Sequence, residues 1–409
     1  MALEDIIKNR INKLNKIKIS GVEPYPVFCN REMTCKEAKE NFGKLSKSKK
    51  KIILAGRIRI IRAHGGLTFV ELDDGTDKIQ ISLQKSKIGE KAYKFFIDNF
   101  DAGDFVETRG ILFKTKRGEK TLEVSNYKIL SKSLRPLPEK WHGITDVEER
   151  FRKRYLDLLF NDEIKEKFVL KAKIIREIRK YLDENGFIEV DTPILQPIYG
   201  GAKARTFKTI HNALNSTFYL RISPELYLKR LLVGGFEKVY EMGKCFRNEG
   251  IDRSHNPDFT MLEFYFSYID YKELMKFTEK FLSSIIKNVL GKLTIDYQGQ
   301  KINFKTPWKR VEFLDFVKKE TGIDYNSINK EELAKKAKKL GIEASKTMDK
   351  PEIIDEIYKK TCRHKLQNPT FLIHHPVGFF PLAKSYEKDA GKLANFQLIV
   401  AGWEIVNAF

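Results

Sequence analysis

The segment from Tyr240 to Tyr265, YEMGKCFRNEGIDRSHNPDFTMLEFY, constrains the fold of this chain more than any other. Its two ends have the apolar and aromatic composition of β-strands. Its middle carries six charged or titratable side chains, which are Arg247, Glu249, Asp252, Arg253, His255 and Asp258. Charges that lose contact with water need a partner of opposite charge or a ligand. The segment therefore predicts an antiparallel hairpin with a binding site between its strands.

Alternation of side chains along the two strands predicts which residues share a face of this hairpin. One face is apolar and is predicted to be core: Leu262, Phe264 and Phe266. The other face places Arg247 beside Phe259, and both near Glu263 and Tyr265. A cation, a flat aromatic surface, a carboxylate and a phenol suit a ligand with a phosphate, a planar ring and an amine. A buried Arg–Glu pair with aromatic packing would produce the same pattern.

The length of 409 residues is too great for one ordinary core and predicts at least two domains. Five short β-rich runs follow one another from Lys51, separated by turn signals such as Asp74-Gly75, and predict a small closed barrel of the oligonucleotide-binding (OB) type. Pro136 and Pro138 then indicate a linker. Mixed strands and helices after the linker predict an α+β domain, whose last apolar stretch, FQLIVAGWEIVNAF (396–409), is expected to be one strand. The predicted parts are a helical segment at 1–50, the barrel at 51–134, the linker at 135–150 and the α+β domain at 151–409, with a lysine-rich helical insertion at about 306–365.

The composition limits the classes of function. The net charge of +21 fits a polyanionic partner such as nucleic acid, and it equally fits a lysine-rich proteome. No apolar run is long enough to span a membrane, and the N-terminus lacks the apolar core of a signal peptide. The four cysteines form no metal-binding pattern and suit a reducing compartment. We therefore expect a soluble, cytoplasmic protein without a cysteine-bound metal.

Four stretches of the sequence resemble lysyl-tRNA synthetases, which are class II aminoacyl-tRNA synthetases. RISPELYLKRLLVGGFEKVYEMGKCFRNEGIDRSHNPDFTMLEFY (221–265) resembles the motif 2 region of that family, and FIEVDTPIL (187–195) resembles motif 1. GGAKARTF (200–207) is similar to the glycine-rich substrate loop, and RPLPEKWHGITDVEERFRKRYLDL (135–158) to the junction after the barrel. The resemblance implies an OB-fold anticodon-binding domain, an antiparallel-sheet catalytic domain, and a homodimer formed through motif 1 around Pro193. It also implies activation of L-lysine with ATP and transfer to tRNA(Lys).

The same resemblance assigns roles to individual residues. Arg247 matches the catalytic arginine that holds the α-phosphate of ATP. The remaining ATP-binding residues are Glu249, His255, Asn256 and Phe259. The implied lysine-binding residues are Gly201, Glu225, Glu263, Tyr265, Asn407 and Phe409. Mg²⁺ would accompany ATP at Glu404, with Gln397 standing where the family usually has a second glutamate. In the barrel, Arg62, Phe69 and Gln80 match readers of the anticodon.

Other interpretations stay open at this point for three of these residues. His255 could be a loop histidine bonded to backbone, Glu225 could compensate the positive end of a helix, and Phe69 could belong to the barrel core. The family continues beyond Asn407-Ala408-Phe409 with motif 3, so we expect this chain to be truncated before that motif or to lack a complete ATP site. A non-catalytic tRNA-binding protein with a synthetase-like fold is the alternative function. An aspartyl- or asparaginyl-type enzyme is disfavoured, because its substrate would not pair with Glu263.

Overall fold

The computed structural model describes residues 2–138, 146–252, 255–345 and 347–409. Contacts divide the chain into two compact units, Met1–Ile164 and Lys165–Phe409, and each is described by itself. Part of the predicted linker, residues 139–145, lies outside the described residues. In the described part of the chain no helix is long and apolar enough to cross a membrane.

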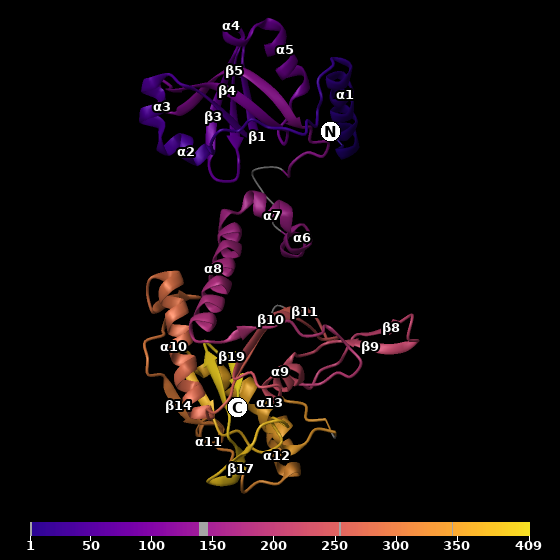
Figure 1. The fold of residues 1–409 in the computed structure, drawn as a ribbon, viewed down its shortest axis with the longest axis vertical. Coiled ribbons are helices and arrows are strands. Elements are labelled where there is room, and N and C mark those ends of the chain that lie inside the picture. The colour runs from indigo at the N-terminus through magenta and orange to yellow at the C-terminus, as the bar shows by residue number, and fades with distance from the viewer. Residues whose placement is uncertain (1, 139–145, 253–254, 346) are drawn as a thin grey trace. The chain divides into compact units, whose positions relative to one another are not determined.

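The first unit contains a closed five-stranded barrel with the strand order β1-β2-β3-β5-β4 (Figure 1). Its strands are β1 (Lys51–His64), β2 (Leu67–Asp73), β3 (Lys78–Gln84), β4 (Phe105–Lys114) and β5 (Lys120–Ser131). Burial in β2 follows the period of two expected for a barrel wall, because Thr68, Val70 and Leu72 are buried whereas the residues between them are only partly so. The predicted OB-type barrel is therefore confirmed.

The first unit also contains seven described helices and one extended segment. The helices are α1 (Leu3–Ile19), α2 (Cys35–Glu40), α3 (Phe42–Ser48), α4 (Lys85–Ile88), α5 (Glu90–Asn99), α6 (Val147–Arg152) and α7 (Arg154–Phe160), of which the last two follow the barrel in sequence. Ile17 of α1 is fully buried in the barrel core. Residues 20–34 between α1 and α2 are not helical, and the Glu32 backbone N–H donates to the carbonyl of Ile53 in β1 (3.1 Å). The first 50 residues are thus two helical parts separated by an extended strap.

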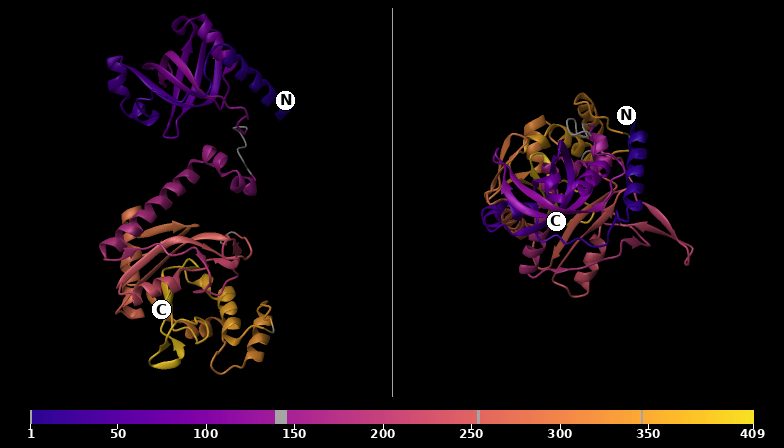
Figure 2. Two further views of the ribbon diagram at one scale, coloured as in Figure 1. Left: turned by 45° about the vertical axis from the view of Figure 1, so that its right-hand side comes forward. Right: turned by 90° about the horizontal axis from the view of Figure 1, so that it is seen from above.

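The second unit combines three small sheets and two hairpins with helices. Its helices are α8 (Asp162–Glu184), α9 (Glu225–Val233), α10 (Tyr271–Leu290), α11 (Phe313–Thr321), α12 (Lys330–Lys339) and α13 (Lys350–Thr361), and a 3-10 turn η1 (Arg363–Lys365) follows. One sheet has the order β11-β10-β6, another β14-β15-β18-β19 and a third β7-β9-β8. The strands are β6 (Ile188–Glu189), β7 (Leu195–Gln196), β8 (Lys208–His211), β9 (Ser216–Leu220), β10 (Lys238–Phe246), β11 (Asp258–Phe266), β12 (Thr294–Tyr297), β13 (Gln300–Asn303), β14 (Lys309–Glu312), β15 (Thr370–Ile373), β16 (Ser385–Tyr386), β17 (Asp389–Leu393), β18 (Phe396–Val400) and β19 (Trp403–Ala408). The hairpin of β8 and β9 projects from the body of this unit (Figures 1 and 2).

The structure has helices in the predicted insertion, but it differs from the prediction for the final strand. The insertion contains α11, α12 and α13, which build an apolar cluster of their own around residues such as Leu333 and Ile354. The last apolar stretch was expected to be one strand, and this expectation is wrong. It folds back on itself as β18 and β19, because Ala401 (φ 50°) and Gly402 (φ 75°) form a two-residue turn with positive φ at both positions.

Candidate active site

The hairpin of β10 and β11 has the register that side-chain alternation predicts. Cys245 lies opposite Phe259, and Glu241 lies opposite Glu263. The other face of the hairpin belongs to an apolar cluster that includes Tyr240, Leu262 and Phe264. The face that was predicted to bind a ligand is therefore the one that carries Phe259 and Glu263.

Arg247 lies just beyond the end of β10 but keeps its place beside the partner strand. Its backbone N–H donates to the carbonyl of Pro257 (2.8 Å), which extends the pairing by one residue. Its guanidinium carbon lies 5.1 Å from the centroid of the Phe259 ring. Within the described residues, its buried Nε atom has no hydrogen-bond partner. A cation with an unused donor on an aromatic surface suits an anionic, planar ligand.

Glu263 is a partly buried carboxylate held by two neutral hydroxyl groups. Ser223 Oγ donates to Oε1 (2.6 Å) and Tyr265 OH donates to Oε2 (3.0 Å). Burial raises the pKa of Glu263, and the two hydroxyl bonds act in the opposite direction. Among the residues that the structure describes, no Lys or Arg forms an ion pair with Glu263. A carboxylate in this setting is complementary to a cationic ligand group.

A second carboxylate, Glu225, lies close to the first at the start of α9. The residue is only 7% exposed, and its backbone N–H donates to Ser223 Oγ (3.0 Å). Lys229 Nζ binds Glu225 Oε1 (2.7 Å) and lies 5.0 Å from the centroid of the Phe409 ring. Gly201 (φ +88°) packs against this group, because a Cβ atom there would lie 2.8 Å from Ser223 Oγ. The glycine-rich loop, the start of α9 and the end of β19 thus converge here.

The remaining predicted ATP-binding residues are exposed and make local contacts. Asn248 N–H donates to the Arg205 carbonyl (2.9 Å), and Arg205 N–H donates to Glu249 Oε1 (3.4 Å). Glu249 therefore ties the motif 2 segment to the loop at 200–207. His255 Nδ1 pairs with Asp252 Oδ2 (2.7 Å), and the His255 backbone N–H donates to Asp252 Oδ1 (2.9 Å). Asn256 is exposed on the same segment.

The predicted metal pair lies on β18 and β19. Gln397 is opposite Asn407 in the ladder, and Gln397 Nε2 donates to Glu404 Oε2 (3.1 Å). Arg247 is among the charged neighbours of Glu404, together with Lys359 and Arg363. In the described part of the chain no group of three or more His, Cys, Asp or Glu side chains could hold a metal ion.

Arg221 and Glu241 form a buried ion pair at the base of the site, which the sequence analysis did not predict. Arg221 Nη1 pairs with Glu241 Oε1, and Thr192 Oγ1 donates to Glu241 Oε2 (2.6 Å). Arg221 Nε also donates to the Lys244 carbonyl (2.8 Å). Gly243 has to lack a side chain, because a Cβ atom would overlap the guanidinium of Arg221. This group ties the motif 1 segment to β10.

The three predicted anticodon readers share the outer surface of the barrel. Arg62 lies opposite Phe69 in the ladder, and Arg62 Nη2 donates to Gln80 Oε1 (3.3 Å). Gln80 Nε2 in turn donates to Thr121 Oγ1 (2.9 Å). Phe69 is partly exposed and lies outside the apolar cluster of the barrel, so it is not a core residue.

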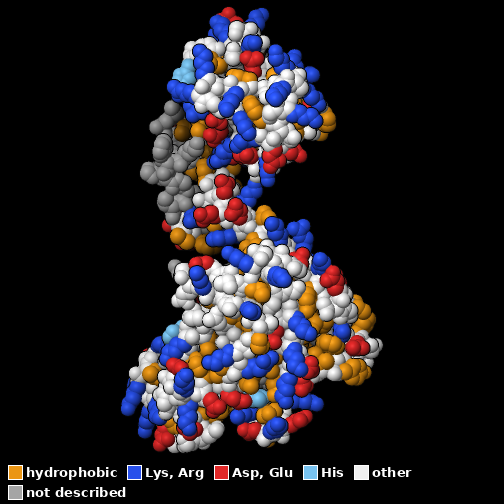
Figure 3. All heavy atoms as spheres, turned by 90° about the vertical axis from the view of Figure 1, so that its left-hand side faces the viewer, with side chains coloured by type: hydrophobic (Ala, Val, Ile, Leu, Met, Phe, Trp, Pro, Cys, Tyr) orange, Lys and Arg blue, Asp and Glu red, His pale blue; other side chains and the backbone are white. Residues whose placement is uncertain are grey.

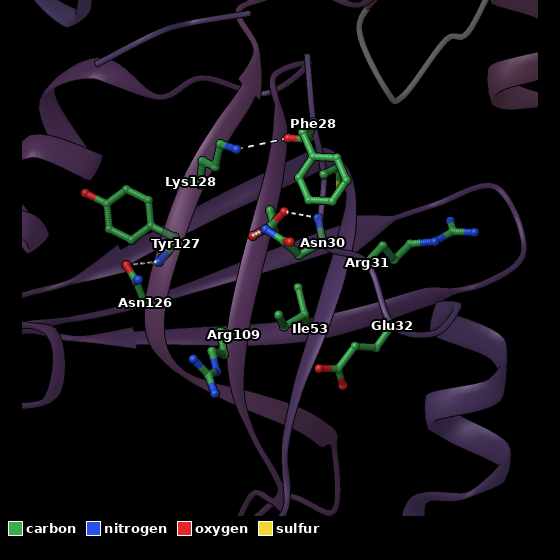
Figure 4. Close-up of a pocket in the computed structure, with 11 residues that line it drawn as sticks. Phe28, Asn30, Arg31, Glu32, Ile53, Arg109, Asn126, Tyr127 and Lys128 are labelled. Carbon is green, nitrogen blue, oxygen red and sulfur yellow. Dashed lines mark hydrogen bonds between the residues drawn. The ribbon is translucent and has the colours of Figure 1, made fainter. Parts of the chain in front are cut away.

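The barrel also has a hollow of about 690 Å³ under the extended strap (Figure 4). Its polar groups hold the strap in place. Asn30 N–H donates to Glu107 Oε2 (2.6 Å), and Lys128 Nζ donates to the Phe28 carbonyl (2.9 Å). None of the sequence-predicted site residues lines this hollow.

Comparison with known proteins matches each of the two domains to a known protein family. The family described as tRNA synthetases class II (D, K and N) matches residues 146–409. This chain belongs to that class II tRNA synthetase family. A family described as OB-fold nucleic acid binding domain matches residues 52–130, which is the barrel. The resemblance inferred from the sequence motifs and the α+β fold class are therefore confirmed.

Curated relatives of this class II synthetase match it over its whole length. The lysine–tRNA ligase of Carboxydothermus hydrogenoformans is 47% identical over 408 residues, which cover 100% of this chain and 83% of that protein. The lysine–tRNA ligase of Thermotoga maritima is 44% identical over 411 residues, covering 100% of this chain and 82% of that protein. That of Pelotomaculum thermopropionicum is 44% identical over 410 residues, covering 100% of this chain and 80% of that protein.

Basic residues of this synthetase are not confined to one stripe. Figure 3 shows Lys and Arg side chains spread over the visible face of each unit and mixed with Asp and Glu. On this face the basic side chains are therefore interspersed with acidic ones. A particular nucleic-acid contact has to be identified from local geometry and not from total charge.

Proposed function

We propose that this chain is a lysine–tRNA ligase, which activates L-lysine with ATP to lysyl-adenylate and transfers the lysyl group to tRNA(Lys). The relatives with this name support the proposal, and one observation carries it. Glu263 is a carboxylate at the ligand-facing surface with only neutral hydroxyl partners, Ser223 and Tyr265, among the described residues. Such a group favours a cationic substrate side chain over the carboxylate or amide of aspartate or asparagine.

Lysine has two ammonium groups, and the site offers a carboxylate for each. In this proposal Glu263 and Tyr265 bind the ε-ammonium. Glu225 and the Gly201 carbonyl bind the α-ammonium. Before lysine binds, Lys229 pairs with the Glu225 carboxylate and compensates its charge. Phe409, which lies under Lys229, and Asn407 border the same pocket in this proposal.

Activation is an in-line attack of the lysine carboxylate on the α-phosphate of ATP. Negative charge grows on that phosphate, so a preorganised cation stabilises the transition state more than the ground state. Arg247 would bind the α-phosphate with its guanidinium, and Phe259 would stack on adenine. Glu249, His255 and Asn256 would contact the nucleotide from the loop. Mg²⁺ would accompany ATP on its phosphates, with Glu404 as the protein carboxylate able to ligate it.

Lysine-dependent exchange of pyrophosphate into ATP tests this function. Any exchange should depend on lysine and should not occur with aspartate or asparagine in its place. Tight binding of tRNA(Lys) without any exchange would instead support the non-catalytic alternative. We propose the cytoplasm as the location of this chain, because the proposed reaction belongs to translation.

The anticodon-binding role of the barrel gives a first mutational prediction. Phe69→Ala should weaken binding of a lysine anticodon stem-loop by about 1–3 kcal/mol, because one base would lose its stacking surface. Fluorescence anisotropy with the labelled stem-loop measures the change. Phe28→Ala in the extended strap removes an exposed aromatic ring (66% exposed) from the same unit outside this surface and should leave the affinity unchanged. A loss with Phe28→Ala equal to that with Phe69→Ala would show that the surface around Phe69 does not read bases.

We also propose that the chain forms a homodimer through motif 1 around Pro193. Exposed apolar side chains concentrate in and beside this motif, notably Ile194 (43% exposed) and Ile198 (77% exposed). Such a concentration is typical of a protein interface.

The dimer proposal predicts a change of mass on mutation. Ile194→Asp with Ile198→Asp should convert the dimer to a monomer, because two charges would be buried without partners. Light scattering after size exclusion measures the mass. Leu340→Asp, at a comparably exposed apolar residue (40%) in the helical insertion, should leave the dimer intact. A monomeric wild-type chain would refute the proposed interface.

A further inference from the structure

We infer that Gln397 is a positioning residue that fixes the carboxylate of Glu404, and that it is not a metal ligand. This inference rests on the proposed function, because it concerns the metal ions that accompany ATP. It predicts that the ATP complex of this chain holds one divalent cation fewer than a site with carboxylates at both positions.

The orientation of the Gln397 amide is the main argument. Its nitrogen donates to Glu404 Oε2 (3.1 Å), so its oxygen points away from that carboxylate. On the other side lies His375, whose ring approaches Gln397 and whose Nδ1 is bonded to Asn395 Nδ2 (3.0 Å). The side chain of Gln397 is only 8% exposed, which leaves it little freedom to turn. For a divalent cation to bind between Gln397 and Glu404, the amide would have to rotate, and the hydrogen bond from its nitrogen to the Glu404 carboxylate would have to break.

His375 lies beside the Gln397 amide. Its ring is fully buried, packs against Phe313 at an interplanar angle of 32° with centroids 4.4 Å apart, and contacts Phe379. Because Asn395 Nδ2 donates to Nδ1, the ring proton belongs on Nε2, which is buried without a hydrogen-bond partner among the described residues. The contact that sets the orientation of the amide is therefore its hydrogen bond to the Glu404 carboxylate.

Protein cations near Glu404 further reduce its attraction for a metal ion. The charged neighbours of this carboxylate are Asp355, which pairs with Lys359 (2.7 Å), and the cations Arg363, Lys359 and Arg247, so that the cations outnumber the neighbouring carboxylate. The β18–β19 turn packs against the backbone that follows Arg363: Gly402 N–H donates to the Leu366 carbonyl (3.0 Å), and a Cβ atom on Gly402 would lie 3.2 Å from the Cα of His364. A guanidinium repels a divalent cation and can itself bind phosphate oxygens. The site thus compensates nucleotide charge with protein cations.

Counting bound Mn²⁺ tests the inference on the full 409-residue chain. Binding of α,β-methylene-ATP is first measured by calorimetry, and the free Mn²⁺ signal is then followed by electron paramagnetic resonance. Gln397→Glu should bind one more Mn²⁺ per nucleotide complex than the wild type, or bind it at least tenfold more tightly. Gln397→Leu should bind as many as the wild type. Gln300→Glu, at an exposed position in β13, adds the same charge elsewhere and should also match the wild type.

The possible results separate this inference from the proposed function. Loss of a Mn²⁺ ion in Gln397→Leu would show that the amide is a ligand. Equal Mn²⁺ binding by the wild type and Gln397→Glu would show that the side chain at position 397 does not determine how many ions bind. Either result overturns the inference and leaves the proposed function standing. Failure of the wild type to bind α,β-methylene-ATP at all would instead overturn the proposed function, and the inference with it. A folding defect in Gln397→Glu is recognised by its melting temperature, and Gln397→Leu then decides.

Discussion

Arg247→Ala should slow lysine-dependent pyrophosphate exchange by roughly 10²–10³-fold, mainly through kcat, because the removal of one preorganised charge contact in a transition state has about this effect. The guanidinium already rests on Phe259, 5.1 Å from its ring centroid, and one of its nitrogens is buried without a partner among the described residues. It therefore needs little reorganisation when an anion binds. Lysine affinity, measured by calorimetry without ATP, should change little.

Two further variants show whether charge, geometry or stability explains this loss. Arg247→Lys keeps the charge but not the planar fork, so its exchange rate should fall between those of the wild type and Arg247→Ala. Arg179→Ala removes an exposed arginine that pairs with Glu189 (2.9 Å) and should exchange like the wild type. Wild-type exchange by Arg247→Ala would show that another group holds the α-phosphate.

Glu263→Gln should weaken lysine binding by about 2–5 kcal/mol, which is the usual effect of removing one partner of a buried, hydrogen-bonded charge pair. The amide has nearly the shape of the carboxylate, so the fold should be kept. The lysine ammonium would lose its counter-charge, and Ser223 and Tyr265 would lose a charged acceptor. Calorimetry with lysine measures the change, and the affinity for α,β-methylene-ATP should stay as in the wild type.

The pH dependence of lysine binding and a matched control variant provide further tests of the role of Glu263. Burial raises the pKa of Glu263, and bound lysine favours the ionised form, so lysine binding should weaken as the pH falls through that raised pKa. Glu273→Gln, at an exposed residue paired with Lys276, should bind lysine normally over the same pH range. Unchanged lysine affinity in Glu263→Gln would remove this residue from substrate recognition.

The barrel and the ligand-facing hairpin could be predicted because both depend on short-range patterns. In the barrel, turn signals separate strands whose apolar residues alternate, and closure follows from five such strands in succession. In the hairpin, a period of two places Phe259 and Glu263 on the face that Arg247 approaches, whatever the rest of the chain does. The strand prediction failed for the last residues because Ala401-Gly402 lacks a strong turn signal between two apolar runs.

The sequence by itself therefore determined the barrel, the parity of the hairpin and the family, since these rest on local periodicity and on motifs in a fixed order. Only the tertiary structure decided which distant groups meet: Ser223 with Glu263, Lys229 with Phe409, and Arg221 with Glu241. It also decided that the Gln397 amide donates to Glu404, because the direction of an amide depends on the neighbours on both of its sides. Such contacts join segments tens to hundreds of residues apart, and no local pattern encodes the packing that brings them together.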